Sequence, residues 1–111
     1  MLFRSSHNKM GDVLVAQGDG PGALAAYQAA LTIREGLAKR DPANTQWQVD
    51  VAVSCSKLGS LDSLLSAADR KEYLQRGRNI LISLKNAGKL HPSQDHIDWF
   101  DQALKGMKEL G

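Results

Sequence analysis

Four side chains that could bind a metal ion lie close together near the C-terminus: His91, Asp95, His96 and Asp98. Imidazoles and carboxylates are common ligands of zinc. The two histidines are separated by five positions with a proline between them, which matches known ligand spacings poorly. We therefore predict capping and loop roles for this group, and no metal site.

The other reactive residues form no catalytic pattern. Cys55 lies on an apolar helical stripe, where a buried structural thiol is the ordinary expectation, and no histidine is expected near it or near a serine. Residues 18–22, Gly-Asp-Gly-Pro-Gly, lack the Gly-Lys-Ser/Thr ending of a phosphate-binding loop and follow a helical pattern. We interpret them as a turn, and we expect neither an enzyme nor a bound cofactor.

Basic residues gather between positions 70 and 89, where only Glu72 opposes them locally. We expect them to give one helix a positive side, which favours a solvated outer face over a docking site for an acidic partner. The group consists of Arg70, Lys71, Arg76, Arg78, Lys85 and Lys89.

The composition is typical of a single globular domain. The chain has 111 residues, of which 42% are hydrophobic and 23% charged. A net charge of +2 and an aromatic content of 5% do not indicate a nucleic-acid partner. The single cysteine fits a reducing compartment, and the chain has neither the apolar run of a signal peptide nor that of a membrane span. We expect a cytoplasmic protein that does not act at a membrane.

Six residues recur almost letter for letter. Ser-His-Asn-Lys-Met-Gly at 6–11 returns as Ser-Cys-Ser-Lys-Leu-Gly at 54–59, 48 positions later. Self-similarity at a fixed period indicates one supersecondary unit that has been copied and stacked.

Apolar residues spaced by three and four predict the elements of these units. We expect helices over about 2–17, 21–39, 45–65, 69–85 and 93–110. Asp19 or Gly20, Asn44 and Asp69 are the expected N-caps of the second, third and fourth helices. The sequence predicts a single all-α domain over 1–111: one antiparallel hairpin over about 2–40, a second over about 44–88, and a capping helix over about 92–110.

From His7 onward the chain resembles the tetratricopeptide repeat family. The family pattern W-x-x-L-G-x-x-Y, A-x-x-x-F, A is occupied by His7, Met10, Gly11, Leu14, Ala23, Tyr27 and Ala30. The resemblance covers about residues 5–90, although the second copy is clear only over 54–59. The period of 48 exceeds the family's 34 by 14 residues, or about two extra turns for each helix of a pair. This is similar to long-helix members such as kinesin light chains and bacterial signalling proteins, and it implies an α-solenoid.

In this family the first helix of each repeat lines a concave groove that holds a peptide or a partner helix. The resemblance therefore implies the following groove residues: Ser5, Asn8, Asp12, Val15, Val53, Ser56, Ser60 and Ser63. This mainly small and polar face either bonds a peptide backbone or is a solvated surface without a ligand. Co-chaperone members clamp a C-terminal carboxylate with a lysine and an asparagine, but here Asn8 and Asp12 fill those slots, and Asp12 would repel a carboxylate.

We therefore expect a non-catalytic scaffold for protein–protein interaction, whose partner is another protein or peptide. Two alternatives stay open: the structural C-terminal end of a longer array, or a homodimer formed through the N-terminal edge, where Leu2, Phe3 and Val13 should be partly exposed. A bundle with a ligand in its core ranks last, because the inward positions hold almost no polar or ionisable residues.

Overall fold

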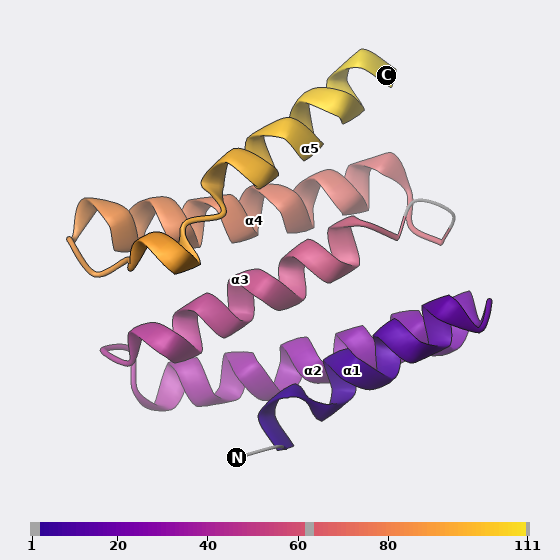
Figure 1. Ribbon diagram of the computed structural model, residues 1–111, viewed down its shortest axis with the longest axis horizontal. Helices are drawn as coiled ribbons and strands as arrows, with labels where there is room; N and C mark the ends of the chain where they lie inside the picture. Colours follow the sequence, from indigo (N-terminus) through magenta and orange to yellow (C-terminus); the bar gives the residue numbers. More distant parts are fainter. Residues whose placement is uncertain (1–2, 62–63, 111) are drawn as a thin grey trace.

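The chain is all-helical in the computed structural model, which describes residues 3–61 and 64–110, and side chains over 9–61 and 64–107 (Figure 1). The helices are α1 (Phe3–Ala16), α2 (Gly20–Arg40), α3 (Thr45–Gly59), α4 (Ala67–Asn86) and α5 (Ile97–Leu110), with a short 3₁₀ turn, η1 (Pro92–Gln94), before α5. No helix in these ranges is both long enough and apolar enough to cross a bilayer.

The helices pack on one another in chain order, α1 on α2, α2 on α3, α3 on α4 and α4 on α5. The shortest dimension of the molecule, 21 Å, is the thickness of two helix layers. In Figure 1, α1, α3 and α5 form the nearer layer and α2 and α4 the farther one. The C-terminal half of α5 diverges from α4.

Polar side chains begin the helices. Asp19 and Asn44 accept the backbone N–H three residues further on, at 2.9 Å and 3.1 Å, which confirms them as the N-caps of α2 and α3. The expected cap of α4 is wrong. Ser66 Oγ accepts the N–H of Asp69 at 3.1 Å, so Ser66 is the cap and Asp69 lies in the first turn.

Two helix boundaries differ from the prediction. α3 ends at Gly59 instead of near residue 65, because Ser60 and Leu61 turn back with i to i−3 hydrogen bonds of 3.2 Å that tighten its last turn. α5 begins at Ile97 instead of near residue 93, because Pro92–Gln94 forms a separate 3₁₀ turn.

The core has two clusters of buried residues joined by Ile80, which packs against both. The first lies between α2 and α3, and the second joins α3, α4 and α5. On α5 the apolar residues Ile97 and Phe100, three positions apart, are buried, while Asp98 and Asp101 are exposed.

Gly11 and Gly59 each lie against a bulky side chain of the following helix. A Cβ added at Gly11 would overlap the ring of Tyr27, and one added at Gly59 would overlap the side chain of Leu74. Tyr27 and Leu74 are 47 positions apart, one fewer than the two glycines. A comparison at a fixed offset of 48 therefore pairs Tyr27 with Gln75 and not with Leu74.

Buried polar residues lie between α2 and α3, contrary to the expectation that inward positions hold almost none. Arg34, Asp50 and Ser54 are buried. The Arg34 guanidinium donates to the carbonyl oxygen of Asp50 at 2.9 Å and to Ser54 Oγ at 3.0 Å. Arg34 lies on the buried face of α2, so its guanidinium reaches the core. The two acceptors on α3 satisfy its hydrogen bonds there.

Candidate functional site

The histidine–aspartate group near the C-terminus holds a helix start. His91 Nδ1 accepts the N–H of Ser93 at 3.0 Å, and Asp95 Oδ1 accepts that of Ile97 at 3.2 Å. The other oxygen of Asp95 pairs with Lys85 Nζ at 3.0 Å. The pKa of Asp95 is lowered mainly by the bond from Lys85 and also by the bond from the Ile97 N–H. The predicted capping role is confirmed for His91 and Asp95. Within the described ranges no three potential ligands gather as they would around a metal ion.

Cys55 is a buried thiol, as its position on the apolar stripe predicts. Its exposed fraction is 0%, and burial raises the pKa of Cys55 to about 12. The thiol therefore keeps its proton at neutral pH, and the protonated form is a poor nucleophile.

The basic residues of α4 do not form one positive side, so that expectation is wrong. Arg70 donates from Nε to the carbonyl oxygen of Gly59 at 3.0 Å on α3, whereas Arg76 pairs with Glu35 of α2. Two others turn the opposite way, Arg78 to Asp101 and Lys85 to Asp95. Lys71 and Lys89 are exposed. Successive α4 residues point about 100° apart, which distributes these charges around the helix.

The predicted groove residues have different surroundings: Asp12 and Val15 lie on α1, Val53 and Ser56 lie on α3, and Ser60 follows the end of α3. Ser5 and Asn8 belong to α1 but their side chains are outside the described part, and Ser63 lies outside the described residues. Val15 is exposed, and Val53 packs against the cluster shared with α4 and α5. Ser56 Oγ donates to the carbonyl oxygen of Val53 at 2.6 Å, and Ser60 Oγ to that of Ser56 at 2.8 Å. Partner binding by this set stays a prediction.

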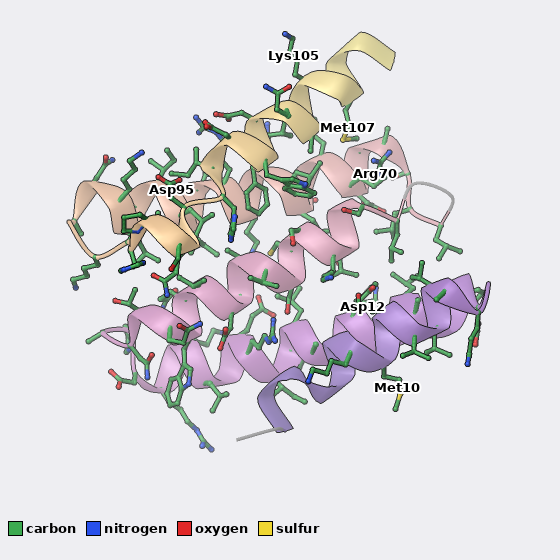
Figure 2. The ribbon with its side chains drawn as sticks, viewed as in Figure 1. Met10, Asp12, Arg70, Asp95, Lys105 and Met107 are labelled. Carbon is green, nitrogen blue, oxygen red and sulfur yellow. The ribbon has the colours of Figure 1, made fainter. Side chains whose placement is uncertain are left out.

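Asp12, one of the predicted groove residues, connects three helices. Tyr27 on α2 donates its hydroxyl to Asp12 Oδ1 at 2.5 Å, and Lys57 Nζ on α3 lies 3.1 Å from the same oxygen. Figure 2 shows Asp12 pointing from α1 toward α3. Partial burial alone would raise the pKa of Asp12, but the Tyr27 hydroxyl and the Lys57 ammonium outweigh it and lower the pKa. Burial and the bond to Asp12 raise the pKa of Tyr27.

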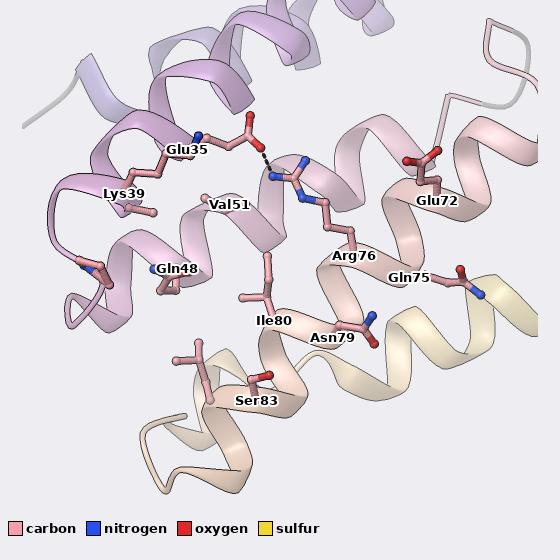
Figure 3. A pocket seen from close by; sticks show the side chains of 13 residues that line it. Glu35, Lys39, Gln48, Val51, Glu72, Gln75, Arg76, Asn79, Ile80 and Ser83 are labelled. Atoms are coloured by element: carbon pink, nitrogen blue, oxygen red, sulfur yellow. Dashed lines mark hydrogen bonds and ion pairs between the residues drawn. The ribbon is translucent and has the colours of Figure 1, made fainter.

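A groove of about 930 Å³ lies between α2 and α4, with α3 beneath it (Figure 3). We call it the α2–α4 groove. Its floor is apolar, made by Ala38, Val51, Ile80 and Leu84. Its polar walls include the amides and hydroxyl of Gln48, Gln75, Asn79 and Ser83.

One ion pair bridges the α2–α4 groove, since Arg76 of α4 reaches Glu35 of α2 (Figure 3). Lys39 lies on the α2 side and Glu72 at the far end of the α4 side, so the four charges balance. None of the groove residues implied by the family resemblance lines the α2–α4 groove. The polar residues Glu72, Arg76, Asn79 and Ser83 recur every three or four positions along α4, and that stripe is the signal that could have indicated it.

The outer face of α1 carries exposed apolar side chains. Met10 is 58% exposed and Val13 54%. The expected exposure is thus confirmed for Val13, whereas Leu2 and the side chain of Phe3 lie outside the described part.

No match is found when the chain is compared with models of protein families, with curated proteins or with solved structures.

Proposed function

We propose that this chain is a non-catalytic interaction module of the tetratricopeptide type, a scaffold that holds a segment of another protein in the cytoplasm. The packing of the hairpins supports the family assignment. Gly11 against Tyr27 and Gly59 against Leu74 are the same kind of contact in successive helix pairs. The family's small residues serve this close approach of two helices.

The observation that carries the binding function is the α2–α4 groove. Protein binding sites combine an apolar floor with a few polar groups that fix orientation. The amides of Gln48, Gln75 and Asn79 each offer donors and an acceptor, which suits the N–H and C=O groups of an extended main chain. The occupant is an extended segment whose apolar side chains cover Val51 and Ile80. This groove lies between the second helices, α2 and α4, with Gln48 and Val51 of α3 also lining it, whereas the resemblance implies a groove lined by the first helices.

The experiment compares capture of partners from the source organism by the wild-type chain and by three variants. Asn79→Trp with Ser83→Trp fills the α2–α4 groove. Gln28→Trp with Thr32→Trp is the matched control, because these exposed residues have the same spacing on α2 and do not line the groove. Asn8→Trp with Ser56→Trp blocks the first-helix face.

We expect the groove-filled variant to lose specific partners that the control retains, with a loss of about tenfold or more in affinity for a purified partner. Loss only in the Asn8 and Ser56 variant would move the site to the first-helix face. Equal capture by all four proteins would contradict the interaction function.

A second candidate function is favoured by the exposed Met10 and Val13 on α1. These side chains would be covered if α1 packed against a preceding repeat of a longer array or against a second copy of the chain. Sedimentation at micromolar concentration tests the second copy. A dimer that becomes monomeric when both residues are changed to Glu would support it, and a monomeric wild type would contradict it.

A further inference from the structure

A second hollow, of about 620 Å³, opens where α5 leaves α4. The two helices touch where the ring of Phe100 lies against Gly77, and beyond that contact the C-terminal half of α5 diverges (Figure 1). Ala67 and Ala68 of α4 face this space, with Leu104 and Met107 of α5. Figure 2 shows Met107 pointing from α5 toward α4. We call this space the α4–α5 wedge.

The rim of the α4–α5 wedge is positive. Lys71 of α4 and Lys105 of α5 both line it and are exposed, and neither forms an ion pair within the described residues. Its lining carboxylate, Asp101, is already bound by Arg78. The α2–α4 groove differs, because its two acids balance its two bases.

We propose that the α4–α5 wedge binds an acidic amphipathic helix of another protein. Apolar side chains of that helix would cover Leu104 and Met107, and the flexible thioether of Met107 adapts to different shapes. Carboxylates on its flanks would meet Lys71 and Lys105. A channel between two diverging helices suits a third helix, which packs by laying its ridges into their grooves.

The wedge is independent of the proposed function. Gln75 lines both hollows, but the other wedge residues named above do not line the α2–α4 groove. A partner could therefore occupy either hollow without the other. Charge complementarity supplies selectivity and a faster association rate, so the acidic flanks decide which helices are accepted.

The probe is a synthetic two-heptad helix with Leu on one face, Glu on both flanks and Ala elsewhere. A matched peptide carries Lys in place of each Glu. Each is titrated into the full chain labelled with ¹⁵N, and the shifted amide resonances give the site and the affinity. We expect the Glu peptide to shift resonances over 67–75 and 101–107, and to bind about tenfold or more tightly than the Lys peptide.

Charge reversal supplies the second measurement. Lys71→Glu with Lys105→Glu should invert the preference between the two peptides, whereas Lys9→Glu with Lys89→Glu, which line neither hollow, should leave it unchanged. All four lysines are exposed, so circular dichroism should show the same helix content in each variant. Raising the salt concentration should weaken binding of the Glu peptide.

Three outcomes would overturn the proposal: no shift at about 1 mM peptide, equal affinity for the two peptides, or shifts confined to the α2–α4 groove. Shifts over the wedge with phosphatidylserine vesicles and none with the Glu peptide would also overturn it and assign the surface to anionic membranes. None of these results bears on the Asn79 and Ser83 test, so the two proposals fail separately.

Discussion

At three glycines an added side chain would overlap a residue of the following helix. Gly11 lies against Tyr27, Gly59 against Leu74, and Gly77 against the ring of Phe100, with Cys55 also close by. At each place the missing side chain of one helix gives room to a large side chain of the next. A glycine inside a helix weakens it by roughly 0.5–1 kcal/mol relative to alanine, so close packing must offset that loss.

Gly77→Ala and Gly36→Ala should change stability in opposite directions. Both positions are inside a helix, so alanine adds the same helix propensity, about 1 kcal/mol. A Cβ at Gly77 would overlap Phe100 and lie 3.2 Å from Cys55 Cβ, whereas one at Gly36 has no neighbour within 4 Å. We expect Gly77→Ala to lower the free energy of unfolding by about 1–3 kcal/mol and Gly36→Ala to raise it by about 0.5–1 kcal/mol. Urea denaturation measures both, and equal effects would contradict the close packing.

Cys55 should react with thiol reagents only after the protein unfolds. Burial raises the pKa of Cys55 from its usual 9.0 to about 12, so at pH 8 the folded chain presents a protonated, inaccessible thiol. Because the unfolded chain releases this proton first, the free energy of unfolding should also fall between about pH 9 and pH 12. A thiol assay with and without denaturant tests the first expectation, and fast reaction without denaturant would contradict the burial of Cys55.

At the scale of the elements, a contact between the end of α3 and the start of α4 holds the second hairpin closed. α3 stops at Gly59 and α4 starts at Ala67, with Ser66 as its cap. Arg70, in the first turn of α4, bonds the carbonyl oxygen of Gly59 at 3.0 Å and so ties the two ends together. This contact fixes where α4 begins relative to α3.

Ser66→Ala should lower the free energy of unfolding by about 1 kcal/mol, because it removes the acceptor for the N–H of Asp69. Ser66→Asp restores an acceptor and should recover most of that stability. Thermal or urea unfolding measures both variants. An equal loss in the two variants would contradict the capping role, because Ser66→Asp restores the acceptor.

The contact between α2 and α3 has a polar centre. Arg34→Ala leaves the buried carbonyl of Asp50 and hydroxyl of Ser54 without this donor and removes the volume of the side chain. We expect a loss of about 3 kcal/mol or more in the free energy of unfolding, against about 1 kcal/mol for Ser54→Ala. Denaturant unfolding followed by circular dichroism compares the two, and a small effect of Arg34→Ala would contradict its burial.

At the scale of the whole molecule, each helix is held by its neighbours in chain order, and α1 has only α2 as a close neighbour among the described helix pairs. Asp12 of α1 contacts Tyr27 of α2 and Lys57 of α3, so it connects α1 to both of these helices. The two hollows lie on either side of α4. The polar stripe of α4 lines the α2–α4 groove, and Lys71 lines the α4–α5 wedge.

Acid should weaken the attachment of α1. Because the pKa of Asp12 is lowered below its usual 3.8, its contribution is present above that pH and is lost as the pH falls through the folded-state pKa. Asp12→Asn should therefore be less stable than the wild type at pH 6, and the difference should shrink toward pH 3. Urea denaturation at both pH values measures it. Asp41→Asn, an exposed carboxylate without an ion pair in the described part, is the control, and the same pH dependence there would contradict the role of Asp12.

The sequence by itself determined the helices and much of their burial. Periodic apolar residues indicated all five helices, and short polar side chains with a proline or glycine located the starts of α2 and α3, because these signals act within one or two turns. Burial of Cys55, Ile97 and Phe100 followed from the same periodicity.

Contacts between helices were decided only by the tertiary structure. Lys57 meets Asp12 and Arg76 meets Glu35 across more than forty positions, and Gly59 lies against Leu74, which is 47 and not 48 positions after Tyr27. Helix periodicity defines a face, but the angle at which two helices cross and the length of the loop between them decide which residues of that face meet. The α2–α4 groove and the α4–α5 wedge are products of those angles, which no local pattern encodes.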